Sequence, residues 1–254
     1  MSKILSVFNQ KGGVGKTTVT INLAAGLARR KKRVLVVDVD PQCNTTTGMG
    51  IHPVEGKSIY EWLRGESTYE EVVVSPVWRM DLIPGSQDMA AFDLEMASTE
   101  GREYRLKEEL DKVCENYDYI VIDCPPALGL LSVNALVASD SVLIPIQCEY
   151  YALEGLSALM DTVQRIRGGM NPELDVEGVL LNMVDKRNNL TKDVISEVTK
   201  YFGEKVYRTH IPRNVRLAEA PSYGMSIFDY DNLSRGAWAF NTWVKEFLRR
   251  SENG

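Results

Sequence analysis

Cysteine and histidine are scarce in this sequence, and the way they are scattered excludes two classes of protein. The 254 residues include four cysteines and two histidines. Cys43, Cys114, Cys124 and Cys148 show no CxxC or Cys/His spacing, so they predict neither a zinc site nor the disulfide framework of a small secreted domain. We therefore expect four free thiols, buried or half-buried, in a reducing cytosol.

Long apolar runs are also missing. No stretch approaches the roughly 20 apolar residues that a membrane-spanning helix needs. The opening MSKILSVFNQKGG has too short an apolar run for a signal peptide and no small-residue cleavage site. Repeats, low-complexity tracts and Gly/Ser/Pro-rich linkers are absent as well. With 44% hydrophobic and 25% charged residues, the sequence predicts one cytoplasmic globular domain over residues 1–254.

The sequence has no overall excess of positive charge. Its net charge of −6 argues against a protein that coats nucleic acid over its whole surface. The charge is uneven, because residues 1–185 hold 17 Lys/Arg against 27 Asp/Glu, whereas residues 186–250 hold 12 against 7. Only the last third is therefore expected to attract a polyanion.

Short apolar runs alternate with helical patterns along most of the chain. Near-continuous Val/Ile/Leu runs between amphipathic segments predict an α/β fold, with a mostly parallel twisted β-sheet covered by helices on both faces. The expected strands are ILSVF, RVLVVDVD, YDYIVIDCPP, SVLIPIQ and VEGVLLNMVD. From about residue 51 to 99 the pattern is less regular, with short helices expected in SIYEWLRG and SQDMAAFDLEMAS on either side of the strand MDLIPG.

A glycine-rich segment, NQKGGVGKTT at residues 9–18, follows the first expected strand and opens the first expected helix. Glycines let successive backbone N–H groups point at a phosphate, and the helix N-terminus adds its positive dipole end. Lys16 would reach the β- and γ-phosphates, and Thr17 offers a hydroxyl to Mg²⁺. The ordinary phosphate-loop pattern has a glycine where this chain has Gln10, and the chain carries a second lysine, Lys11.

Three aspartates stand at or just beyond the ends of expected strands. Asp38 and Asp40 end the second strand, and Asp123 ends YIVID. A lone aspartate at a strand end is usually a turn or capping residue. Because ligands of open α/β sheets sit beyond the carboxyl ends of the strands, three aspartates beside a phosphate loop favour the handling of Mg²⁺ and water.

These motifs carry a family resemblance. KGGVGKTT, DVDPQCNTT and IDCPP resemble the deviant Walker A ATPases. QCEYYALEGL (residues 147–156) and IPRNVRLAEAPSYG (residues 211–224) narrow the resemblance to the ParA/Soj partition ATPases, over essentially the whole chain. The resemblance implies a single-domain P-loop fold of the short chromosomal type, without an N-terminal DNA-reading domain, and slow hydrolysis of ATP with Mg²⁺.

The resemblance also implies roles for individual residues. Lys11 is the signature lysine that crosses a dimer interface to the partner's phosphates, Lys16 contacts phosphate, and Asp40 orients the attacking water. Thr17 and Asp123 hold Mg²⁺, Asp123 through water. The implied nucleotide contacts are Lys11, Gly12, Gly13, Val14, Gly15, Lys16, Thr17 and Thr18, together with Pro212 and Asn214 of an IPRN loop that packs beside the adenine.

For partners, the resemblance implies an ATP-dependent homodimer that binds double-stranded DNA without sequence preference and associates with the nucleoid. A ParB-like partner is expected to stimulate hydrolysis, and the cargo is left open between a chromosome, a plasmid and a protein assembly. We expect Arg187 and Arg216 to contact DNA, because both are placed in turns from which long side chains project. Lys200 and Lys205 are expected to lie at a solvated helix end and not to contact DNA.

Two rival functions are weighed against the partition ATPase. A MinD-like membrane ATPase would need residues 233–250 to lie in a lipid interface, with Trp238, Trp243 and Phe247 on the apolar face. A final helix that packs these aromatic side chains on the sheet fits at least as well, so no stable membrane association is expected. A redox relative would need cluster-ligating cysteines, but Cys124 lies inside the IDCPP motif.

Three positions depart from the family pattern. Cys43 stands where glycine is common, Asn182 where threonine is common, and Met225 where lysine is frequent. Met225 puts one phosphate contact in doubt. Asn182 opens Asn-Met-Val-Asp, which resembles the guanine-reading Asn-Lys-x-Asp motif of GTPases but lacks its lysine, so ATP is preferred over GTP.

Overall fold

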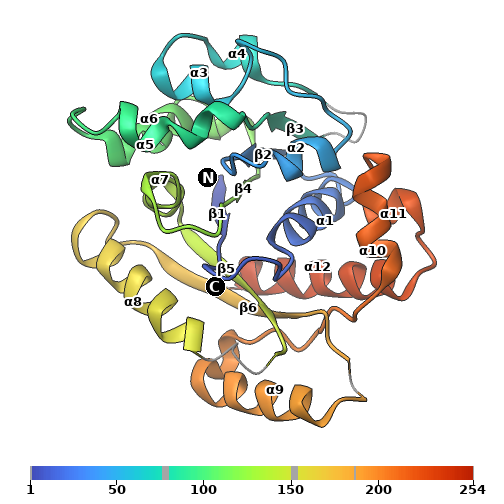
Figure 1. Ribbon diagram of the computed structural model, residues 1–254. Helices are drawn as coiled ribbons and strands as arrows, with labels where there is room; N and C mark the ends of the chain where they lie inside the picture. Colours follow the sequence, from blue (N-terminus) through green and yellow to red (C-terminus); the bar gives the residue numbers. More distant parts are fainter. Residues whose placement is uncertain (1, 76–79, 150–153, 186, 254) are drawn as a thin grey trace.

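The computed structural model describes residues 2–75, 80–149, 154–185 and 187–253. Its described strands form one parallel sheet of six, in the order β3-β2-β4-β1-β5-β6. The sheet runs through the middle of the molecule (Figure 1). The predicted α/β fold is thereby confirmed. The strands are β1 Lys3–Val7, β2 Val34–Asp38, β3 Met80–Ile83, β4 Tyr119–Asp123, β5 Ser141–Gln147 and β6 Asp175–Asn182.

Burial explains why these strands are continuously apolar. Every residue of β2 and β4 is buried, because helices cover both faces of the sheet. One face packs against α1 (Lys16–Ala28), α10 (Val215–Glu219), α11 (Ile227–Tyr230) and α12 (Arg235–Asn253). The other face packs against α3 (Ile59–Arg64), α6 (Arg105–Asp111), α7 (Leu130–Ala138), α8 (Glu154–Gly169) and α9 (Asn189–Phe202).

The irregular middle of the chain largely follows the expectation. Ser58 and Glu61 form a capping box that starts α3 inside SIYEWLRG. The second expected helix is broken, because SQDMAAFDLEMAS forms a 3-10 turn, η1 (Gln87–Ala90), and then the short α5 (Phe92–Glu95). The remaining short elements are α2 (Asn44–Gly48), α4 (Tyr69–Val72), η2 (Arg102–Tyr104), η3 (Cys114–Asn116), η5 (Gly203–Lys205) and η6 (Ala220–Tyr223).

The last helix, α12, uses its apolar face in the core. Trp243 and Phe247 are fully buried against the sheet, whereas Trp238 is 71% exposed. The apolar side chains that a lipid-facing helix would present are therefore mostly occupied by packing. Among the described residues, no helix combines the length and apolar character needed to cross a membrane.

The four thiols match the sequence expectation. Cys43, Cys124 and Cys148 are buried, Cys114 is half-buried, and all four are free. Burial raises the pKa of the Cys124 thiol, so it stays protonated inside the fold. In the part of the chain that is described, no group of three or more His, Cys, Asp or Glu side chains is arranged to hold a metal ion.

Candidate nucleotide-binding site

The glycine-rich loop between β1 and α1 adopts a backbone that favours glycine. Gly13 and Gly15 have φ angles of +75° and +87°. A Cβ atom added at Gly12 or Gly13 would meet nothing within 4 Å, so this side of the loop is open. At Gly15, by contrast, a Cβ would lie 2.4 Å from Nδ2 of Asn182. The loop therefore faces open space on one side and is tightly backed on the other.

The N-terminus of α1 is suited to an anion. Gly15 occupies the capping position, no side chain caps the helix, and no acidic residue lies in its first turn. The first N–H groups of a helix have no partners within the helix, and the macrodipole is positive there. Phosphate groups would supply both the missing acceptors and the favourable charge.

Lys16, the first residue of α1, is buried and folds back over the loop. Its Nζ donates to the carbonyl oxygen of Asn9 at 3.1 Å and approaches that of Lys11 at 3.5 Å. Burial lowers the pKa of Lys16, and the attraction of Asp123 opposes this shift. Asn9 fixes the loop in turn, because it donates to the Pro145 carbonyl at 2.8 Å and accepts from the backbone N–H of Lys11 at 2.9 Å.

Asp123 gathers three threonine hydroxyls beneath the loop. It ends β4 in register with Asp38 of β2, and it accepts hydrogen bonds from Thr17 at 2.8 Å, Thr45 at 2.6 Å and Thr20 at 3.2 Å. Burial raises the pKa of Asp123, while the hydrogen bonds from Thr45 and Thr17 lower it. A hydroxyl and a carboxylate are hard oxygen ligands, and Mg²⁺ usually completes such a set with waters and substrate phosphates. The donor set fits the predicted Mg²⁺ site.

Asp38, the last residue of β2, is bonded to the backbone and side chain of the protein around it. Its side chain is fully buried and accepts from both the N–H (2.8 Å) and the hydroxyl (2.7 Å) of Thr46. The same hydroxyl accepts from the Gly85 N–H at 2.8 Å. Burial and the nearby charge of Asp123 raise the pKa of Asp38. Asp38 therefore ties the start of α2 to β2 and β3.

Asp40 lies just beyond β2, at the rim of the site. Its side chain is mostly buried, and one oxygen, Oδ1, accepts from the Gln42 N–H at 3.0 Å. Its carbonyl oxygen accepts from the N–H of Cys43, whose φ of +53° is left-handed. A left-handed backbone of this kind favours glycine, so the cysteine at this position is strained.

Asn182, at the end of β6, backs the phosphate loop. Its Nδ2 donates to the carbonyl oxygen of Val14 at 2.8 Å, and its Oδ1 accepts from the N–H of Met183 at 2.9 Å. The side chain is buried, so both polar ends are satisfied inside the protein. This contact joins residues far apart in the sequence, and no sequence motif predicts it.

The loop expected beside the adenine is joined to the same strand end. Val184 donates its N–H to the Ile211 carbonyl at 2.9 Å and pairs with Pro212 in an isolated bridge. Asn214 caps α10 by accepting from the N–H of Arg216 at 2.8 Å. The structure thus brings the IPRN loop next to the strand that contacts the phosphate loop, and adenine recognition by Pro212 and Asn214 stays a prediction.

The two arginines expected to bind DNA are both exposed. The Arg187 side chain is 89% exposed and pairs with Asp185 at 2.7 Å. The Arg216 side chain is 53% exposed and pairs with Glu219 at 2.9 Å and with Asp231 at 3.5 Å. The expectation that both lie in turns is wrong for Arg216, which is the second residue of α10, because Asn214 caps a helix there.

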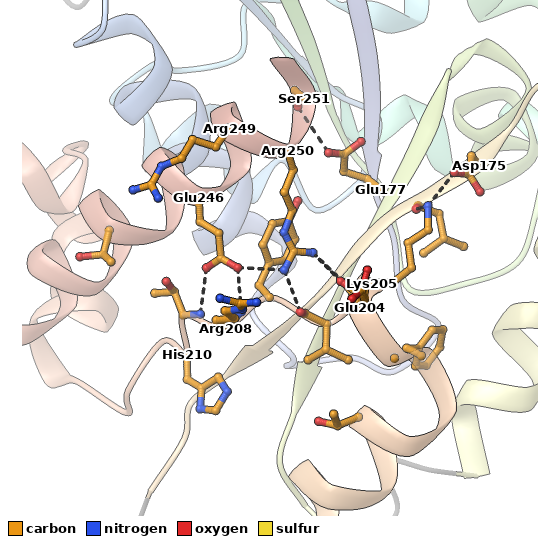
Figure 2. A pocket seen from close by; sticks show the side chains of 18 of the residues that line it. Asp175, Glu177, Glu204, Lys205, Arg208, His210, Glu246, Arg249, Arg250 and Ser251 are labelled. Carbon is orange, nitrogen blue, oxygen red and sulfur yellow. Dashed lines mark hydrogen bonds and ion pairs between the residues drawn. The ribbon is translucent and has the colours of Figure 1, made fainter. Parts of the chain in front are cut away.

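A hollow of about 1270 Å³ lies at the other end of the sheet from the phosphate loop, where β1 and β6 begin (Figure 2). Arg250 crosses it, donating to the carbonyl oxygens of Glu204 and Val206, each at 2.9 Å, and pairing with Glu246 at 2.9 Å. Its guanidinium also stacks 4.3 Å from the centre of the Tyr207 ring. These contacts hold α12 against η5, so the charged groups of Arg250 and Glu246 that line the hollow are already engaged in structural contacts.

Two threonines that hydrogen-bond to the buried aspartates were not among the residues predicted from the sequence. Thr45 and Thr46 directly follow the DVDPQCN segment, and their hydroxyls donate to Asp123 and Asp38. The two adjacent threonines after this segment are the sequence signal that could have predicted them. Of the QCEYYALEGL segment, residues 150–153 lie outside the described residues.

A glycine-rich loop between the first strand and its helix, with aspartates at the ends of neighbouring parallel strands, defines a P-loop nucleotide-binding protein. Residues 2–176 match a family model described as an AAA domain. The chain is 52% identical over 248 residues to the sporulation initiation inhibitor protein Soj of Bacillus subtilis, covering 97% of this chain and 98% of the relative. It is 46% identical to the chromosome partitioning protein ParA of Myxococcus xanthus, covering 98% and 89%. The chain belongs to the Soj/ParA family of chromosome-partitioning ATPases.

A solved structure agrees with the fold over nearly the whole chain. The crystal structure of cobyrinic acid a,c-diamide synthase from Mycobacterium smegmatis, with bound ADP and magnesium, superposes with a TM-score of 0.87. It is 33% identical and covers 99% of this chain and 96% of its own. The resemblance to partition ATPases predicted from the motifs is therefore confirmed at the level of family and fold.

Proposed function

We propose that this protein is an ATP-hydrolysing partition switch that dimerises on ATP and Mg²⁺, and that the dimer binds DNA without sequence preference. The observation that carries the proposal is the group beneath the phosphate loop, in which the Thr17 hydroxyl lies 2.8 Å from Asp123 and buried Lys16 spans the loop. The ADP and magnesium bound to the solved relative support the same ligands for this site.

Each residue of the nucleotide-binding site has a separate role in the proposed hydrolysis. Bound Mg²⁺ would neutralise phosphate charge, held by the Thr17 hydroxyl and, through water, by Asp123. Lys16 contacts the β- and γ-phosphates, and the open loop at Gly12 and Gly13 lets backbone N–H groups approach them. Asp40, with one oxygen engaged by Gln42, orients the water that displaces ADP from the γ-phosphate.

Lys11 would act on the partner protomer. Its side chain is only partly buried, which leaves the ammonium group accessible to a partner protomer. A lysine donated across the interface neutralises phosphate charge only when two protomers meet, as an arginine finger does. ATP then holds the dimer together, slow hydrolysis times its release, and a ParB-like partner speeds that step.

Dimerisation is tested by measuring mass in solution, by size-exclusion chromatography with light scattering, with and without ATP and Mg²⁺. We expect Lys16→Ala to lose ATP binding, and Lys11→Ala to bind ATP and stay monomeric. Asp40→Ala should bind ATP and accumulate as a dimer, because the attacking water is no longer oriented. An Asp40→Ala protein that stays monomeric while the parent dimerises would show that the role given to Asp40 is wrong.

The DNA surface is proposed to form from the basic last third of the chain. Arg187 and Arg216 are exposed, and the carboxylates with which they form ion pairs are themselves about one-third exposed, so these ion pairs are weak. Phosphates would replace those carboxylates, and a dimer would align two copies of each arginine along the duplex. Association with the nucleoid would follow from this surface, and α12 would serve the core rather than a lipid interface.

Salt dependence tests the two arginines. Each phosphate contact contributes about 0.9 to the slope of log affinity against log salt. We expect the double variant Arg187→Ala, Arg216→Ala to weaken binding to every duplex alike and to lower the slope, while ATP-dependent dimerisation persists. Lys200→Ala, an exposed lysine on α9, is the matched control and should change little. Unchanged affinity in the double variant would overturn the assignment of these arginines.

A further inference from the structure

The second lysine of the phosphate loop is engaged within its own protomer. The Nζ of Lys11 lies 3.1 Å from Oε2 of Glu149, which follows the end of β5 by two residues. The other carboxylate oxygen of Glu149 accepts from Nε2 of Gln147 at 2.5 Å. The backbone N–H of Glu149 donates to the Gln147 carbonyl at 2.8 Å. Glu149 is therefore fixed at the mouth of the site by its own strand.

The backbone of Lys11 is also fixed. Its N–H donates to the side chain of Asn9, and Asn9 is bonded to the carbonyl of Pro145 in β5. Lys11 and Glu149 are thus both anchored to β5. Their side chains can therefore form the ion pair while the backbone of the loop and of the strand stays in place. The contact between Lys11 and Glu149 is a consequence of how the loop is attached to β5.

One ammonium group cannot hold Glu149 and reach the phosphates of a partner protomer at the same time. We propose that Glu149 acts as a brake in cis: it holds Lys11 in its own protomer and so weakens the association of two ATP-bound protomers. This inference rests on the proposed function, because it concerns the step at which Lys11 crosses to the partner.

The exposure of the pair sets the strength of the brake. The side chains of Lys11 and Glu149 are 35% and 48% exposed. Exposed ion pairs of this kind change an equilibrium by about 1.5- to 5-fold each. A dimer releases two such pairs, so removing the brake should tighten association by about 2- to 30-fold. Such a brake weakens association without preventing it, because the several negative charges of a bound triphosphate attract Lys11 more strongly than one carboxylate does.

The test uses Glu149→Gln, which keeps the length of the side chain and removes its charge. The background is Asp40→Ala, so that hydrolysis does not dissolve the dimer. The dimer dissociation constant is measured by analytical ultracentrifugation at saturating ATP and Mg²⁺, with and without the substitution. The matched control is Glu100→Gln, an exposed carboxylate outside the site. Thermal unfolding without nucleotide verifies that each variant is folded.

We expect Glu149→Gln to dimerise about 2- to 30-fold more tightly than its background, and Glu100→Gln to match the background. The difference should shrink as salt rises, because exposed ion pairs are screened. A dimer of equal or weaker affinity in Glu149→Gln overturns the brake and leaves the proposed function intact. No ATP-dependent dimer in any variant overturns the proposed function, and the brake with it.

Discussion

The contact between Gly15 and Asn182 predicts a strong coupling between two positions of the nucleotide site. Gly15 has φ +87°, and an L-residue in the left-handed region costs about 1–2 kcal/mol. In Gly15→Ala the new Cβ would lie 2.4 Å from Nδ2 of Asn182, so that side chain must move. Moving it breaks the 2.8 Å bond to the Val14 carbonyl and leaves a buried acceptor unpaired, at about 1–3 kcal/mol. Gly15→Ala should therefore destabilise the loop by about 2–5 kcal/mol, the sum of these terms.

A double-mutant cycle isolates this coupling. Asn182→Ala alone should cost about 1–3 kcal/mol, because it also leaves the Val14 carbonyl unpaired. In the double variant the clash is gone and the hydrogen bond is lost only once, so Asn182→Ala should add almost nothing to Gly15→Ala. Urea unfolding of the four proteins, with ATP affinity measured in parallel, gives the interaction energy. Costs that add within about 0.5 kcal/mol would refute the contact.

Further substitutions test other parts of the site and its scaffold. Thr46→Val should destabilise by about 3 kcal/mol in urea unfolding, because Asp38 loses a buried donor and the Gly85 N–H loses its acceptor; a loss under about 0.5 kcal/mol would contradict it. Cys43→Gly should be more stable than Cys43→Ala by about 1 kcal/mol, because φ at this residue is +53°; the reverse order would argue against strain. Arg250→Ala should lower the melting temperature while ATP binding is kept, because its contacts hold α12 against η5; lost ATP binding would contradict the separation of the two regions.

Much of the fold could be predicted because its signals are local. Strands buried on both faces must be apolar throughout, so VLVVD and YIVID indicated β2 and β4 directly. The phosphate loop is equally local, because its glycines and lysines are adjacent in sequence. The register of the sheet then brought Asp38 and Asp123 opposite each other, as expected for the ends of neighbouring parallel strands.

The parts that sequence could not predict depend on distant contacts or on competing local bonds. The Asn182 side chain reaches the Val14 carbonyl across the fold, and no periodicity encodes that pairing. The ion pair between Lys11 and Glu149 depends on the path of the chain after β5. Arg216 was expected in a turn, but the Asn214 side chain captures its N–H and starts a helix instead.

If the proposed function is correct, DNA binding requires ATP and two protomers joined through Lys11. The decisive measurement is the affinity of Asp40→Ala and Lys11→Ala for two unrelated duplexes at the same ATP concentration and salt. We expect Asp40→Ala, held as a dimer, to bind both duplexes equally, and Lys11→Ala to bind ATP but neither duplex. Equal DNA binding by both variants, or a strong preference of Asp40→Ala for one duplex, would contradict it.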